Sequence, residues 1–269
     1  MSTQSLEGRW ALILGASSGF GAATARALAR AGMNVFGVHL DPKRSIDRVH
    51  QVVADIEETG HRAVFFNMNA ADAAKRTAAL DQIEATLEDN AADAIHLVMH
   101  SLAFGTLLPF IAKQPDQAVT EAQMDMTLRV MAHSLVYWIQ DLVRRDLLSN
   151  GSRVFSMTSG GSQRVIKQYG AVSAAKAALE SHTRQLALEL APQGILVNTI
   201  MAGITDTPAL RAIPGHEHML QEALHHNPSG RITTADDIAT MLVSLANPEL
   251  SWITGALIRV DGGEFIVGF

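Results

Sequence analysis

The sequence predicts a doubly wound α/β fold, in which a parallel seven-stranded sheet carries helices on both faces. Short apolar runs alternate with longer helical patterns along nearly the whole chain, as expected when each strand is followed by a crossover helix. The runs are apolar almost throughout, which is typical of parallel strands buried on both faces. A glycine-rich turn follows the first run and opens the first helical segment.

The elements follow the chain in alternating order. Trp10–Leu14 is a short apolar run and is predicted to be a strand, and Phe20–Ala31 is rich in Ala, Leu and Arg, as helices are. A second strand at Asn34–Leu40 precedes a helix at Arg44–Thr59, which Gly60 ends. Further strands are predicted at 63–68, 95–100, 154–158, 196–200 and 256–260, and further helices at 73–88, 121–148, 169–190 and 235–245, with a weakly amphipathic helical insertion over 208–226. Because the alternation runs nearly end to end, we expect a single domain over 1–269 with a substrate lid at about 207–228.

Composition excludes several classes of function. The chain has 269 residues, of which 48% are hydrophobic, enough for a large core, and its net charge of −6 argues against nonspecific nucleic-acid binding. There is no cysteine, so disulfides and thiolate metal sites are excluded. No apolar run reaches the roughly 18 residues of a membrane span, and no N-terminal secretory signal is evident. We therefore expect a cytoplasmic protein that binds neither nucleic acid nor membrane.

The glycine-rich turn predicts a dinucleotide site of the Rossmann type. Gly15, Gly19 and Gly21 are spaced so that the backbone can approach a pyrophosphate, and the following helix offers free N–H groups and a positive dipole end. The same spacing also occurs in ordinary tight turns. Its position between the first strand and the first helix favours the cofactor site, whose predicted contacts from this turn are Gly15, Ser17, Ser18, Gly19 and Phe20.

Two further corners of the sheet are expected to bind the nucleotide. Asn69 and Ala70 follow the third strand, beside the expected adenine, although they can equally form a plain strand-to-helix connection in which Asp72 is the N-cap. The segment His39–Arg44 follows the second strand, where a carboxylate favours the ribose diol of NAD and basic residues favour the 2′-phosphate of NADP.

Charges of both signs occupy this ribose corner. Asp41 favours NAD, whereas Lys43 and Arg44 favour NADP. The alternatives are that Asp41 caps the following helix and that Lys43 and Arg44 are simply solvated. The segment, with His39, Lys43 and Arg44 as predicted contacts, gives a weak preference for NADPH over NADH.

A tyrosine and a lysine on one helix indicate the chemistry. Tyr169 and Lys176 are seven residues apart, roughly 20° short of two full turns and about 10 Å along the axis, so both can face one cleft. A free phenol with a pKa near 10 is a poor acid at neutral pH, and a nearby ammonium stabilises its anion. A capping tyrosine and a surface lysine are the alternative interpretation.

The whole chain resembles the short-chain dehydrogenase/reductase superfamily. The resemblance lies in the glycine turn, in the segment 196–203 and in the ending Ile253-Thr-Gly and Val260-Asp-Gly-Gly. Ordinary members place the tyrosine four residues before the lysine, where this chain has Val172. The Tyr-x6-Lys spacing, and His100-Ser-Leu-Ala-Phe after the fourth strand, are instead similar to enoyl-acyl-carrier-protein reductases.

Other residues resemble a particular branch of those reductases. Ser159 lies seventeen residues before Lys176, at the family's serine position, as in the NADPH-preferring branch, whose substrate segment also resembles 203–210. That branch retains Asn-Asn-Ala after the fourth strand, so this chain mixes features of two branches. The asparagine of the ordinary tetrad is replaced by Met131, which argues against a proton relay through it.

The resemblance implies hydride transfer from NAD(P)H to Cβ of a trans-2-enoyl thioester in fatty acid synthesis. Tyr169 would stabilise the thioester oxygen as it gains charge, Lys176 would bind the nicotinamide ribose, and Ser159 would support the oxygen unless it is simply a buried, backbone-bonded serine. Further cofactor contacts are expected at Ser101 and Leu102, which line the cleft, and at Thr205, Asp206 and Thr207, which lie against the nicotinamide carboxamide and the pyrophosphate. The alternative for Thr207 is that it caps the next helix, before Pro208. Substrate contacts are expected at Ala103, Gly105, Tyr169, Leu210 and Met219. Reduction of a ketone, such as a 3-oxoacyl thioester, is the alternative.

The remaining expectations concern metals and partners. Four histidines between 216 and 226 suggest a metal, but no carboxylate completes a set, so no metal site is predicted. The resemblance implies an acyl-carrier-protein or CoA thioester as substrate. It also implies a homotetramer joined through the helices at 121–148 and 169–190, although a monomer can bury much of their apolar stripe against its own sheet.

Overall fold

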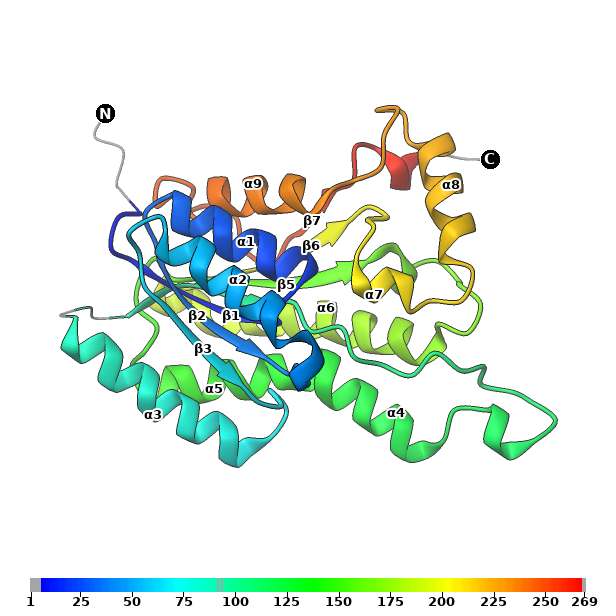
Figure 1. Cartoon of the computed structure of the whole chain (residues 1–269), viewed down its shortest axis with the longest axis horizontal. Helices are drawn as coiled ribbons and strands as arrows, with labels where there is room; N and C mark the ends of the chain where they lie inside the picture. The colour runs from blue at the N-terminus through cyan, green and yellow to red at the C-terminus, as the bar shows by residue number, and fades with distance from the viewer. Residues whose placement is uncertain (1–5, 91, 93, 268–269) are drawn as a thin grey trace.

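The computed structural model describes residues 6–267 except 91 and 93. Its seven strands form one parallel sheet in the order β3-β2-β1-β4-β5-β6-β7, which confirms the predicted fold class (Figure 1). The strands are β1 (Trp10–Leu14), β2 (Asn34–His39), β3 (Ala63–Asn67), β4 (Ile95–His100), β5 (Arg153–Ser159), β6 (Leu196–Ala202) and β7 (Leu257–Val260). The strand order reverses between β1 and β4, which opens the crevice where open α/β sheets bind ligands.

Helices cover both faces of the sheet. One face packs against α1 (Gly19–Arg30), α2 (Ile46–Glu57) and α9 (Ala235–Leu245). The other packs against α3 (Ala73–Asp89), α5 (Ser134–Arg144) and α6 (Gly170–Leu190). The two hydrophobic cores lie on opposite sides of the strands (Figure 1). Packing on both faces fixes the strands, and so fixes the strand ends that form the crevice. None of the described helices is long and apolar enough to cross a membrane.

The helix predicted over 121–148 is interrupted and shorter than expected. It consists of α4 (Glu121–Leu128), one π-helical turn (Arg129–His133) and α5, which ends at Arg144. Asp146 has a φ of +55°, and Leu147 N–H donates to the Leu142 carbonyl, so the chain turns away before residue 148. Apolar periodicity alone does not register one extra residue in a π turn.

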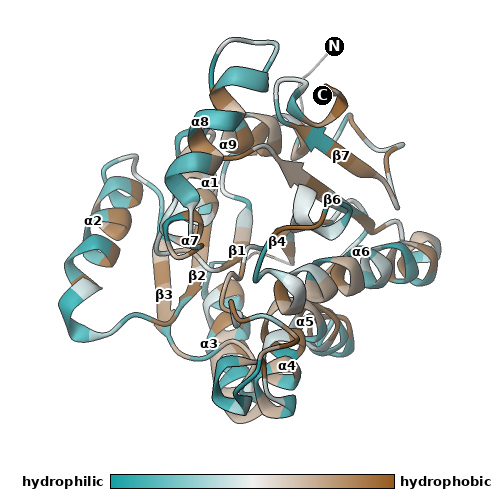
Figure 2. Cartoon of the chain, turned by 90° about the vertical axis from the view of Figure 1, so that its right-hand side faces the viewer, coloured by the Kyte–Doolittle hydropathy of each residue, from teal (hydrophilic) through white to brown (hydrophobic). Residues whose placement is uncertain are grey.

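The predicted insertion over 208–226 is two helices rather than one. α7 (Pro208–Arg211) and α8 (His216–His226) are separated by a turn at Pro214 and Gly215, where Gly215 has a φ of +82°. Both helices lie on the side of the carboxyl ends of the strands, which Figure 2 views directly. The predicted lid therefore lies beside the crevice.

Candidate active site

Two glycines where β1 meets α1, Gly15 and Gly21, are packed so closely that neither position can carry a side chain. A β-carbon on Gly15 would lie 2.5 Å from the Ser101 carbonyl oxygen, and one on Gly21 would lie 2.0 Å from the Gly15 carbonyl oxygen. Ser18, the N-cap of α1, makes no side-chain capping bond, so the first-turn N–H groups are not capped by it. A bare backbone turn before a helix N-terminus fits a pyrophosphate.

The corner after β3 is held by local hydrogen bonds and by one bond from Trp138 of α5. Asn69 Oδ1 accepts from Ala71 N–H at 2.9 Å, and the Ala70 carbonyl accepts from Trp138 Nε1 at 2.9 Å. Asp72 caps α3 by accepting from Lys75 N–H at 3.1 Å, which confirms its predicted capping role. The adenine contact of Asn69 and Ala70 stays a prediction.

The corner after β2 carries a carboxylate that is already well bonded. Asp41 Oδ1 accepts from Ser45 Oγ at 3.1 Å and from Arg48 Nη2 at 2.9 Å, and Oδ2 lies 3.2 Å from Nδ1 of the buried His39. Burial acts to raise the pKa of Asp41, but these hydrogen bonds and one from Ser17 outweigh it and lower that pKa. Asp41 is therefore anionic at neutral pH. It does not cap α2, whose N-cap is Ser45.

The two basic residues of this corner lie outside that network. Lys43 and Arg44 are exposed in a short 3₁₀ turn before α2. Their charges face solvent at the place where the sequence predicts the ribose phosphate.

Tyr169 and Ser159 come together at the carboxyl ends of β5 and the start of α6. The Tyr169 hydroxyl lies 3.3 Å from Ser159 Oγ, and the tyrosine is 8% exposed. Tyr169 immediately precedes α6 and is its N-cap, without a side-chain capping bond. Burial raises the pKa of Tyr169, and the Ser159 bond opposes this in part. The group is therefore a neutral phenol at pH 7, able to donate a hydrogen bond.

Lys176 is buried beneath the same crevice rather than on the surface. Its Nζ donates to the Met157 carbonyl at 2.7 Å, which leaves two of the three ammonium protons for other acceptors. Burial lowers the pKa of Lys176 to about 8, and the negative charge of Glu180 acts in the opposite direction. Glu180 itself accepts from Thr158 Oγ1 at 2.6 Å. The interpretation of Lys176 as a surface lysine is excluded.

A buried histidine closes the site behind the lysine. His100 Nε2 lies 2.8 Å from Ser134 Oγ, which itself donates to the Val130 carbonyl at 2.7 Å. His100 Nε2 is therefore the donor, and Nδ1 has no partner among the described residues. Burial, with the nearby Lys176 charge, lowers the pKa of His100 to about 3. The sequence analysis named His100 only as part of the motif after the fourth strand and gave it no role. It gave Glu180 no role either, because no local sequence pattern shows that this carboxylate is buried.

The predicted substrate residues lie in three different environments. A β-carbon on Gly105 would approach Val172, Thr127 and Met131 within 2.9 Å, so the loop after β4 packs onto α6 and the π turn. Val172, at the ordinary family position of the tyrosine, is buried in this contact. The rest differ in exposure: Leu210 is buried, Met219 is partly buried and Ala103 is exposed.

The loop after β6 is fixed by its own hydrogen bonds. Thr205 Oγ1 donates to the Gly203 carbonyl at 3.0 Å, and Asp206 forms an exposed ion pair with Arg211 at 2.7 Å. Thr207 caps α7 by accepting from Leu210 N–H at 3.2 Å, which confirms the predicted alternative to its cofactor role. Ser101 and Leu102 continue β4 at the crevice, where Ser101 N–H donates to the Leu14 carbonyl at 2.8 Å.

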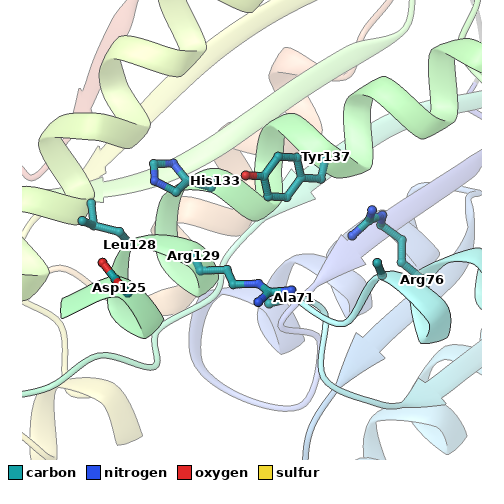
Figure 3. A pocket seen from close by; sticks show the side chains of 8 residues that line it. Ala71, Arg76, Asp125, Leu128, Arg129, His133 and Tyr137 are labelled. Atoms are coloured by element: carbon teal, nitrogen blue, oxygen red, sulfur yellow. The ribbon is translucent and has the colours of Figure 1, made fainter. Parts of the chain in front are cut away.

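A separate pocket of about 490 Å³ is lined by none of the three residues Tyr169, Lys176 and Ser159. It is bounded by α3, α4, the π turn and α5 (Figure 3). Its lining residues are Ala71, Ala73, Arg76, Asp125, Leu128, Arg129, His133 and Tyr137. Within the part of the chain that the structure describes, no three His, Asp or Glu side chains are grouped to hold a metal ion.

Comparison with known proteins agrees with this geometry. A family model described as "Enoyl-(Acyl carrier protein) reductase" matches residues 15–264. The chain is 30% identical to 1-cyclohexenylcarbonyl-CoA reductase from Streptomyces collinus over 95% of this chain and 86% of that protein. Its structure resembles that of the promiscuous reductase LugOII, which catalyses keto-reduction at C1 in lugdunomycin biosynthesis (TM-score 0.82, 31% identity, 98% and 100% of the two chains).

A second similar structure contains a nicotinamide dinucleotide. It is a short-chain dehydrogenase from Burkholderia cenocepacia J2315 in complex with NADP (TM-score 0.79, 30% identity, 97% and 99% of the two chains). With the sheet order, the glycine turn and the Tyr169–Lys176 helix, these matches show that the chain is an NAD(P)H-dependent oxidoreductase belonging to the short-chain dehydrogenase/reductase superfamily, within the family described as enoyl-(acyl carrier protein) reductase.

Proposed function

We propose that the chain is an enoyl-thioester reductase, acting on a trans-2-enoyl group carried by acyl-carrier protein or CoA in fatty acid synthesis. The observation that carries this proposal is which position holds the tyrosine: Tyr169 precedes α6 at the crevice, whereas Val172, at the ordinary family position, is buried against the loop after β4. The name of the Streptomyces relative, a reductase of an unsaturated acyl-CoA, supports the same class of substrate.

The residues present fit a nicotinamide dinucleotide. When bound, the reduced cofactor supplies a hydride to Cβ of the enoyl group. Gly15, Gly21 and the start of α1 would hold the pyrophosphate, and Lys176 would donate its remaining protons to the nicotinamide ribose.

The tyrosine then acts on the opposite end of the conjugated system. Neutral Tyr169 would donate a hydrogen bond to the thioester oxygen, which gains negative charge in the reduction, and one such donor lowers a barrier by roughly 3 kcal/mol. Ser159 supports the phenol, and the Lys176 charge favours the anionic side of the reaction. The α-carbon takes its proton from solvent in a later step.

Reduction of a ketone is a second candidate. The Ser159–Tyr169 contact favours it, because a serine hydroxyl beside the phenol can bind a carbonyl oxygen directly, and the LugOII likeness points to keto chemistry. The experiment follows NADPH oxidation with crotonyl-CoA, with a longer enoyl thioester and with acetoacetyl-CoA. Turnover of the enoyl thioesters in preference to acetoacetyl-CoA supports the first proposal, and the reverse preference overturns it.

NADPH is the proposed cofactor. Asp41 has both oxygens engaged by Ser45, Arg48 and His39, so it competes poorly for ribose hydroxyls, whereas Lys43 and Arg44 are exposed. The same assay with NADH in place of NADPH tests this preference.

The proposal extends to partners and location. An acyl-carrier protein is an acidic partner, and Lys167, Arg211 and Arg231 are the candidate basic contacts. Lys167, two residues before Tyr169, is exposed, whereas Arg211 and Arg231 are paired with Asp206 and Asp237. A homotetramer and a cytoplasmic location complete the proposal.

A further inference from the structure

The C-terminal turn lies against the loops that carry the reactive groups. After β7, Asp261 accepts from Gly263 N–H at 2.9 Å and from Phe265 N–H at 3.0 Å, which fixes a short 3₁₀ turn at Glu264–Ile266. Figure 1 shows this turn, in red, at the same end of the molecule as α8. The turn therefore stands at the carboxyl ends of the strands, where the crevice opens.

One side chain of the turn reaches the loop after β6. Glu264 Oε2 accepts from Ile204 N–H at 2.9 Å, and Glu264 is partly buried. Ile204 immediately precedes Thr205, Asp206 and Thr207, the residues predicted to lie against the nicotinamide carboxamide and the pyrophosphate.

The next residue of the turn reaches the loop after β5. Two guanidinium groups lie over the Phe265 ring, that of Arg164 4.2 Å and that of Arg259 4.4 Å from the ring centroid. Arg164 Nη2 also donates to the Phe265 carbonyl at 2.5 Å. The ring packs beside Gly160, where a β-carbon would lie 3.4 Å away, and Gly160 follows Ser159. The turn thus contacts the loops after β5 and β6 at once.

We propose that Glu264 is a positioning residue for the dinucleotide, which holds the loop after β6 in its binding conformation through the Ile204 N–H. This inference rests on the proposed role of Thr205–Thr207 toward the cofactor. Without the acceptor at Glu264, the start of the loop loses one of its hydrogen bonds and keeps those of Gly203 N–H to the Val260 carbonyl and of Thr205 Oγ1 to the Gly203 carbonyl. The dinucleotide must then order the loop further when it binds.

The charge of Glu264 makes this contact sensitive to acid. Burial raises the pKa of Glu264, and the nearby charge of Asp261 raises it further. The hydrogen bond from Ile204 N–H and the charge of Arg164 act in the opposite direction but do not cancel the shift. As the pH falls through this raised pKa, the carboxylate is protonated and becomes a weaker acceptor. Dinucleotide binding should therefore weaken toward acid pH.

The experiment measures the Kd of NADPH by fluorescence titration, without substrate, between pH 8 and pH 5. We expect Glu264→Ala to raise Kd about tenfold at pH 8, the scale of one charge-assisted hydrogen bond. Glu264→Gln keeps an acceptor and loses the titration, so its Kd should stay within about twofold of wild type at pH 8 and rise less toward acid. The control Ile266→Ala removes a side chain of the same turn that is 76% exposed, and its Kd should be unchanged.

Two results would overturn the proposal: a wild-type Kd for Glu264→Ala, or a Glu264→Gln profile that weakens toward acid as much as wild type. If Glu264→Ala does not fold, the glutamine variant decides alone. Because the titration contains no enoyl thioester, failure here leaves the proposed reaction standing, and failure of the reaction leaves this result interpretable.

Discussion

Burial acts in opposite directions on the pKa values of the two residues that carry the chemistry. It raises the pKa of Tyr169 and lowers that of Lys176 to about 8, so in both cases it favours the neutral form. For the tyrosine this suits a hydrogen-bond donor. For the lysine it makes the charge depend on a neighbour, Glu180.

Replacing Tyr169 by Phe should separate catalysis from binding. The variant removes the donor to the thioester oxygen while keeping the buried ring, so turnover of an enoyl thioester should fall by about 10²–10³-fold. The Kd of NADPH should change little, because the hydroxyl is assigned to the substrate. Tyr137→Phe, a second tyrosine remote from Ser159, is the matched control. Equal losses of turnover and of dinucleotide affinity in Tyr169→Phe would contradict the assigned role.

The pKa of Lys176 should set the alkaline limit of activity, and Glu180 should shift that limit. Lys176 is charged below its pKa, so kcat/KM should decline as the pH rises through about 8. The Glu180 charge raises that pKa, so Glu180→Gln should move the decline to lower pH. Glu189→Gln, an exposed position on the same helix, should leave the profile in place. A decline that stays at the wild-type pH in Glu180→Gln would show that another group limits the rate.

At the scale of elements, the sequence predicted the parts that depend on local pattern. β1, β4 and α9 occur with the predicted bounds, because a buried apolar run or a capped amphipathic segment carries its own signal. The π turn at Arg129–His133 and the break between α7 and α8 were missed. Both depend on backbone geometry that neighbouring segments impose.

The site divides in the same way. Tyr169, Lys176 and Ser159 were predicted from spacing and resemblance, and the structure brings Tyr169 and Ser159 into contact. Glu180 and Glu264 were not predicted. Their roles arise from burial against Thr158 and Ile204, which are distant in sequence, and no local pattern signals such contacts.

The turn between β1 and α1 should tolerate no added side chain. In Gly21→Ala the new β-carbon would meet the Gly15 carbonyl at 2.0 Å, so the turn must open where the pyrophosphate is expected. We expect the Kd of NADPH to rise at least tenfold, measured by fluorescence titration. Gly60→Ala, beyond the end of α2, is the control: its φ of +87° strains any side chain, but no atom lies within 4 Å of its β-carbon position, so it should lower stability and leave the Kd unchanged. Unchanged affinity in Gly21→Ala would place the pyrophosphate elsewhere.

At the scale of the molecule, the stripe predicted to join subunits is largely used within the chain. Met131, Leu135 and Trp138 are buried in the core. The outward surface of this region carries Tyr137, which is 40% exposed, and the contacting pair His133 and His182, whose Nδ1 and Nε2 atoms are 2.9 Å apart. A helical interface between copies would therefore use this polar and aromatic surface around the pocket of Figure 3.

A charge introduced on this surface should dissociate the expected tetramer. In a two-fold interface the same patch meets itself, so the new negative charges of one copy face the patch that carries the same charges on the other copy. Tyr137→Glu combined with His182→Glu should therefore reduce the mass measured by light scattering from that of a tetramer to that of a smaller species, while the unchanged circular dichroism spectrum reports an intact fold. Leu224→Glu on α8, at a residue that is 52% exposed, should leave the tetramer in place. A wild-type monomer, or a double variant that remains tetrameric, would show that these helices do not join the subunits, and the exposed face of α5 and α6 would then need another explanation.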